Sequence, residues 1–88
     1  MPTVSQFFGI SVRLYYTDHP PLHVHAVYQD FEAKLAIETG EVLEGRLPAP
    51  VLRIAREWTR AHRAELIENW QRAREELPLE RIPGADAD

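Results

Sequence analysis

The stretch HVHAVYQDFEAKLAIET, residues 23–39, alternates apolar and polar side chains on both sides of a short polar break. A period of two is typical of β-strands with one buried face, because successive side chains of a strand point to opposite sides of the sheet. The first half of the stretch is therefore predicted to bury Val24 and Ala26. His23 and His25 are predicted to lie together on the opposite face.

The segments around this stretch continue the pattern. Gln29-Asp30 predicts a turn between two antiparallel strands, and Thr39-Gly40-Glu41 predicts a hairpin turn before a short strand that ends by Gly45. Upstream, residues 9–17 alternate in the same way. The pair Pro20-Pro21 lacks backbone donors and belongs in a loop. We therefore expect an antiparallel sheet of three to four strands.

The pattern changes after Pro50, where apolar side chains recur at spacings of three and four. Residues 51–61 gather their apolar side chains around Trp58, and residues 63–77 repeat the design around Trp70. Pro50 suits the first turn of a helix. Both tryptophans are expected in the core. The spacing leaves open whether these residues form one bent helix or two.

These elements predict an α+β fold, with two C-terminal helices packed on one face of the sheet, because each strand and each helix has one apolar side. Residues 1–77 are expected to form a single domain, and residues 78–88 a flexible C-terminal tail. The other face of the sheet is expected to stay open to solvent. The side chains expected on that face are Arg13, Tyr15, His23, His25, Glu32, Lys34 and Glu38.

The composition narrows the classes of function. The chain has 88 residues, no cysteine and a formal net charge of −4. Without cysteine it forms no disulfide, thiolate zinc site or thiol nucleophile, and a cytoplasmic location fits best. No apolar run is long enough to cross a membrane, so no membrane partner is expected. The negative charge argues against sequence-independent nucleic-acid binding, because affinity for phosphates comes from Lys and Arg.

The segment DHPPLHVHA, residues 18–26, contains three of the four histidines of the chain. Residues i and i+2 of a strand point the same way, so His23 and His25 are spaced to share one metal ion. With Asp18 and His19 they would form a ligand set suited to a divalent transition metal such as zinc, nickel or iron. No second cluster of ligands supports this site.

Acid–base chemistry is a second interpretation of the same histidines. Imidazoles exchange protons near neutral pH, and cleavage of RNA by its own 2′-hydroxyl needs a base, an acid and a cation. His23, His25 and Tyr15 are the candidate catalytic residues, and Arg13 and Lys34 the candidate cations. A third interpretation is structural: the carboxylate of an Asx-type turn and the two prolines would only stiffen the connection between strands.

Four arginines form the other candidate site. Arg53, Arg56, Arg60 and Arg63 fall within about an 80° arc of an ideal helix, opposite the apolar side around Trp58. A solvated helix face explains this pattern. The alternative is a binding stripe for an acidic partner or for phosphates, because the planar guanidinium group pairs with both in a bidentate manner.

Several segments carry a resemblance to a known family. The sequence is similar to short bacterial proteins of one domain-of-unknown-function family, over residues 2–77. Its D-H-x-P-x-H-x-H core corresponds here to Asp18, His19, Pro21, His23 and His25. The similar segments are PTVSQFFGI (2–10), YYTDHPPLHVHA (15–26), IETGEVLEGRLP (37–48), EW (57–58) and HRAELIENW (62–70).

The resemblance implies a partner, because members of this family are often encoded beside a second small protein in pairs like those of toxins and antitoxins. We therefore expect a toxin–antitoxin-like component that acts through a protein or nucleic-acid partner, using the open sheet face around His23 and His25. The alternative is a metal-dependent or acid–base enzyme, such as a ribonuclease, that uses His19 and these two histidines. The sequence also leaves open a homo-oligomer.

Overall fold

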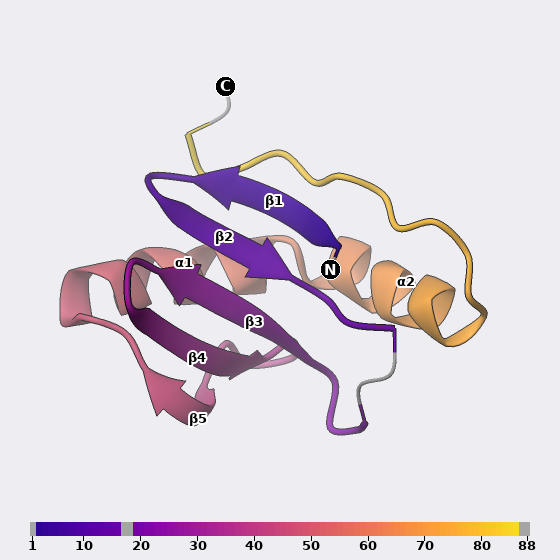
Figure 1. Ribbon diagram of the computed structural model, residues 1–88, viewed down its shortest axis with the longest axis horizontal. Coiled ribbons are helices and arrows are strands. Elements are labelled where there is room, and N and C mark those ends of the chain that lie inside the picture. The colour runs from indigo at the N-terminus through magenta and orange to yellow at the C-terminus, as the bar shows by residue number, and fades with distance from the viewer. Residues whose placement is uncertain (1, 17–18, 87–88) are drawn as a thin grey trace.

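The sheet of this protein has five antiparallel strands, and two helices lie behind it (Figure 1). The computed structural model describes residues 2–16 and 19–86. The strands follow one another in the sheet in chain order. The elements are β1 (Thr3–Phe7), β2 (Ile10–Arg13), β3 (His23–Tyr28), β4 (Phe31–Ala36), β5 (Val42–Arg46), α1 (Ala49–Ala61) and α2 (Arg63–Arg74).

The prediction of three to four strands is wrong by one strand, because β1 did not stand out in the sequence. The pairing of β1 with β2 shifts register between Thr3 and Ser5, so Val4 and Ser5 are both buried and the period of two is lost. Two-residue turns with positive φ at both positions are typical of tight hairpins. Phe8 (φ 50°) and Gly9 (φ 78°) form such a turn between β1 and β2. Gly9 is the residue in the sequence that could have indicated this hairpin.

The core lies between one face of the sheet and the two helices. Trp58 of α1 and Trp70 of α2 are 3% and 4% exposed, which confirms that both tryptophans belong to the core. The ring of Trp58 lies 5.1 Å from that of Phe7, so the helical layer reaches the edge strand β1. The buried residues of the core cluster include Val4, Ile10, Val12, Leu14, Val24, Ala26, Ala33, Leu35, Ile37, Leu47, Ala55, Leu66 and Ile82.

His62 separates the two helices, so the alternative that the sequence left open is resolved as two helices. Its backbone (φ −110°, ψ 26°) leaves the helical region, while its N–H still donates to Trp58 O (3.0 Å). Its carbonyl accepts from Leu66 N–H (2.9 Å), so α2 begins directly after the bend. Neither helix in residues 2–16 and 19–86 is long and apolar enough to cross a membrane.

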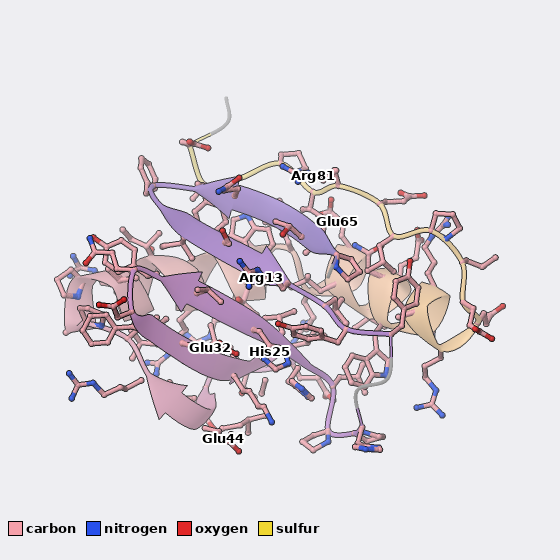
Figure 2. The ribbon with its side chains drawn as sticks, in the orientation of Figure 1. Arg13, His25, Glu32, Glu44, Glu65 and Arg81 are labelled. Carbon is pink, nitrogen blue, oxygen red and sulfur yellow. The ribbon has the colours of Figure 1, made fainter. Side chains whose placement is uncertain are left out.

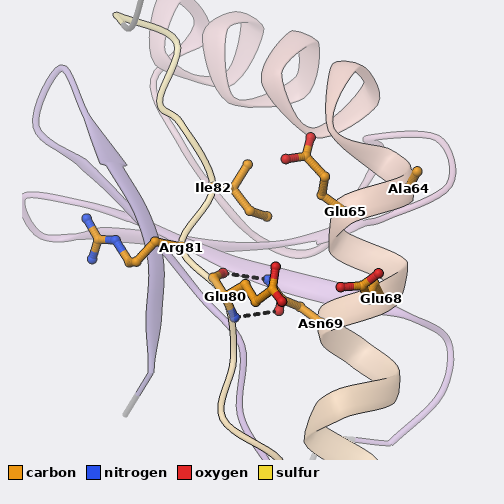
Figure 3. A pocket seen from close by; sticks show the side chains of 7 residues that line it. All are labelled: Ala64, Glu65, Glu68, Asn69, Glu80, Arg81 and Ile82. Atoms are coloured by element: carbon orange, nitrogen blue, oxygen red, sulfur yellow. Dashed lines mark hydrogen bonds between the residues drawn. The ribbon is translucent and has the colours of Figure 1, made fainter.

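The segment after α2 runs back along the outer edge of β1 (Figure 1). Ile82 is buried and its N–H donates to Val4 O (2.8 Å), and Trp58 Nε1 donates to Pro83 O (2.9 Å). The side-chain amide of Asn69 exchanges two hydrogen bonds of 2.9 Å with the backbone of Glu80, beside a hollow of about 280 Å³ (Figure 3). The flexible tail expected for residues 78–88 stays a prediction.

Candidate functional site

A row of polar side chains crosses the sheet on the face turned away from the helices. Arg13 of β2 lies opposite His25 of β3, His25 opposite Lys34 of β4, and Lys34 opposite Glu44 of β5. Positions that oppose each other on neighbouring strands share a face, so these side chains are neighbours. Figure 2 shows Arg13, His25 and Glu44 along this row, with Glu32 beside His25. The row therefore has a basic side chain on each side of one imidazole and an acidic side chain at its β5 end.

His25 is held in one orientation by Glu32. Its Nδ1 lies 3.1 Å from Glu32 Oε2, and the ring of Tyr15 meets the imidazole edge-on at 4.4 Å between centroids. A carboxylate only accepts hydrogen bonds, so Nδ1 carries the hydrogen. In the neutral ring, Nε2 is then the atom that accepts a proton or binds a metal ion.

His23 lies at the start of β3, where the pairing between β2 and β3 has ended. The last paired residues are Arg13 and His25, and the N–H of Leu14 donates to Pro2 O (3.1 Å). Nδ1 of His23 donates to Pro21 O (2.8 Å). Its ring lies 5.1 Å from that of His25 and 5.5 Å from that of Trp70, so a side chain of α2 reaches this end of the sheet.

The structure agrees with one half of the expectation for His23 and His25 and corrects the other. The two rings are neighbours on one side of β3, as the period of two predicts. They do not face open solvent, because each residue is only 6% exposed. The rings of Tyr15 and Trp70 pack against them, and neither contact follows from local periodicity. The histidines therefore form part of a packed aromatic cluster.

A hollow of about 250 Å³ lies beside this cluster. The hollow is open to solvent. The side chain of Leu43, which is 46% exposed, gives it one apolar wall. Leu43 is the extra residue of a β-bulge, since Lys34 pairs with Glu44 and the next residue of β4, Leu35, pairs with Val42. The lining residues are His19, Pro20, Pro21, His23, Lys34, Leu43 and Glu44.

The predicted metal ligands are only partly brought together. Asp18 lies outside the described residues, and His19 is exposed at the rim of the hollow. Within residues 2–16 and 19–86, no group of three or more His, Cys, Asp or Glu side chains is placed to hold a metal ion. In addition, Nδ1 of His23 and of His25 is already hydrogen bonded. The metal site therefore stays a hypothesis that would depend on Nε2 atoms.

The arginines of the helical layer hold the turn between β4 and β5. Arg63 Nη1 donates to Glu38 O (3.2 Å), Arg60 Nε to Thr39 O (2.6 Å) and Arg56 Nε to Gly40 O (3.3 Å). Three arginines, three and four residues apart in the chain, thus each donate a hydrogen bond to one of three successive carbonyl groups. Sequence reasoning missed this arrangement, because it requires knowing that the turn lies beside α1.

Together these features define a small α+β domain with a packed histidine cluster on the sheet face opposite its helices. The chain belongs to the family described as Domain of unknown function (DUF4160), whose sequence profile matches residues 9–71. This confirms the resemblance to an uncharacterised domain family. No curated protein and no solved structure shows a significant match to the chain.

Proposed function

We propose that this protein is a cytoplasmic toxin–antitoxin-like component that acts through a small protein encoded nearby, bound at the sheet face around His23 and His25. The observation that carries the proposal is the hollow beside the histidines. Its exposed Leu43 and its two prolines offer apolar contact, and Lys34 and Glu44, which pair with each other at 3.8 Å, form a polar edge. Such a combination of an apolar centre and a polar rim is typical of protein interfaces.

The buried histidines support binding at this face, because they stiffen its floor. His25 is fixed by Glu32 and Tyr15, and His23 is fixed by Pro21 and Trp70. A surface whose side chains are already ordered loses little conformational freedom when a partner docks. The cluster therefore acts as a rigid base for the hollow.

Co-expression with the product of the neighbouring gene tests this proposal. We expect a stable complex with the unaltered chain, and Leu43→Asp should raise the dissociation constant about tenfold or more, because a charge enters the apolar part of the interface. Leu77→Asp is the matched control, since Leu77 is 43% exposed and lies outside the lining of the hollow. Absence of a complex, or equal effects of the two variants, would refute the proposal.

A second candidate function, cleavage of RNA, is favoured by the pair of His25 and Glu32. A carboxylate behind an imidazole orients the ring for proton transfer. Nε2 of His25 would take the proton of a 2′-hydroxyl, whose oxygen attacks the phosphorus, while His23 or Tyr15 protonates the departing 5′-oxygen. The products would be a 2′,3′-cyclic phosphate and a free 5′-hydroxyl. Arg13 and Lys34 would stabilise the charge that develops on the phosphoryl oxygens.

A cleavage assay on short RNAs separates this candidate from binding alone. His25→Asn should lower the rate at least about a hundredfold if the imidazole transfers a proton. The matched control is His62→Asn, because His62 also contacts a carboxylate, with Nδ1 2.6 Å from Glu65 Oε1, far along the chain from β3. Equal rates for both variants and the unaltered chain would remove catalysis by this cluster.

A further inference from the structure

We propose that α1 and the start of α2 carry a second docking surface, which binds an acidic amphipathic helix of a protein partner. The surface, called here the arginine face, consists of Arg53, Arg56, Arg60 and Arg63. The arginine face belongs to the two helices. The histidine cluster, in contrast, lies on the face of the sheet that is turned away from those helices. The inference is therefore independent of the function proposed for the histidine face.

The charge of the arginine face is not neutralised within the described part of the chain. No described carboxylate forms an ion pair with any of its four guanidinium groups. Arg72 of α2, in contrast, pairs with both Glu68 (3.5 Å) and Glu80 (2.7 Å). This difference occurs in a chain with 14 acidic and 10 basic residues, and Glu57, which lines the hollow beside these arginines, forms no ion pair with them. The arginine face is thus a local positive surface on a negatively charged protein.

The guanidinium groups of Arg56 and Arg60 are also fixed in orientation. Nε of Arg56 and Nε of Arg60 donate to carbonyl groups of the turn after β4. In each planar guanidinium group this leaves the terminal nitrogens as donors for a further acceptor. Arginines that are already ordered lose less side-chain entropy on binding an anion. The turn therefore orients the terminal nitrogens of these two residues so that they can donate hydrogen bonds to a carboxylate or phosphate oxygen.

The hollow beside these arginines favours a protein segment over nucleic acid. It measures about 370 Å³ and contains apolar Leu52 and Ala49 next to the basic groups. No aromatic side chain lines it, so it offers no platform on which bases would stack. The lining residues are Ala49, Leu52, Arg53, Arg56, Glu57 and Arg60.

The spacing of the arginines favours a helical partner segment. Residues three and four apart on a helix have Cβ atoms about 5–6 Å apart, and an acidic helix repeats its carboxylates at the same interval. A helix with glutamates at that spacing and leucines beside them would pair with the arginines while its leucines contact Leu52. Charge and apolar contact thus point to one type of partner.

Fluorescence anisotropy tests the inference with three labelled probes: a helical peptide with glutamate and leucine on adjoining sides, the same peptide with lysine for glutamate, and an RNA oligonucleotide. We expect the full chain to bind the glutamate peptide at low salt and to bind the other two probes more weakly. Arg53→Glu should weaken binding of the glutamate peptide about tenfold, because a repulsive charge replaces an attractive one.

Arg53 is the appropriate variant because its side chain donates to no described carbonyl group, so the turn after β4 is left intact. Arg74→Glu makes the same charge change on an exposed residue at the end of α2 and should leave the affinity unchanged. Thermal unfolding of each variant confirms that the fold is retained. The inference is overturned if the glutamate peptide does not bind, if both variants lose affinity equally, or if the RNA binds more tightly.

Discussion

At the scale of single residues, the histidines show which properties the period of two predicts and which it does not. The alternation of residues 23–28 is sufficient to place His23 and His25 on the same side of β3. Their burial depends on Tyr15 and Trp70, which come from other parts of the chain. Strand parity therefore determines which residues are neighbours, whereas exposure depends on side chains that no local pattern identifies.

Gly45 provides a test of backbone geometry at this scale. Its φ is +79°, and a Cβ added there would overlap the carbonyl oxygen of Glu32 and lie 3.1 Å from Ala33 Cα. Gly45→Ala should therefore lower the free energy of unfolding by about 1–3 kcal/mol or more, as measured by urea denaturation. Gly9→Ala is the control, because Gly9 has φ +78° but its nearest neighbour is the Tyr28 ring at 3.4 Å. A smaller loss at Gly45 than at Gly9 would contradict the predicted overlap.

The hypothesis that the histidines bind a metal ion can also be tested at the level of single residues. Protein purified without a histidine tag should contain less than one zinc, nickel or iron per chain, because the described residues bring together no group of three or more His, Cys, Asp or Glu side chains placed to hold a metal ion. Elemental analysis by mass spectrometry measures this, and partner binding should persist in EDTA. One tightly bound metal per chain, lost together with partner binding in EDTA, would instead support ligand roles for Asp18 and His19.

At the scale of elements, the helical layer was predicted more completely than the sheet. Apolar side chains at spacings of three and four indicated the helical residues but not the break at His62, and the tryptophans at the centres of the two helices are buried. The arginine spacing was visible as well, but its contact with the turn after β4 was not. A helix pattern shows which residues share a side, whereas the partner of that side depends on how the elements pack.

The contact between α1 and this turn leads to a prediction for Arg60. Arg60→Ala should lower the free energy of unfolding by about 1 kcal/mol, because Thr39 O loses its charged donor, with solvent limiting the effect at an exposed site. Arg53→Ala should change it by less than about 0.5 kcal/mol, as is usual for surface positions without such a contact. Chemical denaturation of the two variants provides the comparison. Equal stabilities would mean that the turn is held by the sheet alone.

At the scale of the whole molecule, the segment after α2 connects the helical layer to the outer strand of the sheet. Ile82 contributes to the core, and backbone atoms of this segment bond to Val4, Trp58 and Asn69. The sequence, with its prolines and acidic residues, indicated a flexible tail. Irregular segments show no periodicity, so their docking cannot be recognised from spacing.

Removal of residues 78–88 tests the importance of these contacts. Loss of the buried Ile82 side chain alone should cost about 1.5–3 kcal/mol of stability, since its apolar surface returns to water. Ile82→Ala in the full chain should reproduce part of this loss and leave the hydrogen bonds of Asn69 in place. Thermal unfolding measures both variants. If truncation leaves stability unchanged, the tail is flexible, as the sequence alone predicted.

Local sequence patterns were enough to predict the α+β class, the amphipathic helical residues after Pro50, the sides of β2, β3 and β4, and the clustering of His23 with His25, because each follows from the local period of a strand or helix. Tertiary contacts were needed to establish the fifth strand, the break between the two helices, the burial of the histidines, the arginine contacts with the turn and the docking of Ile82. These features require residues far apart in the chain to meet, and chain topology determines which ones do so.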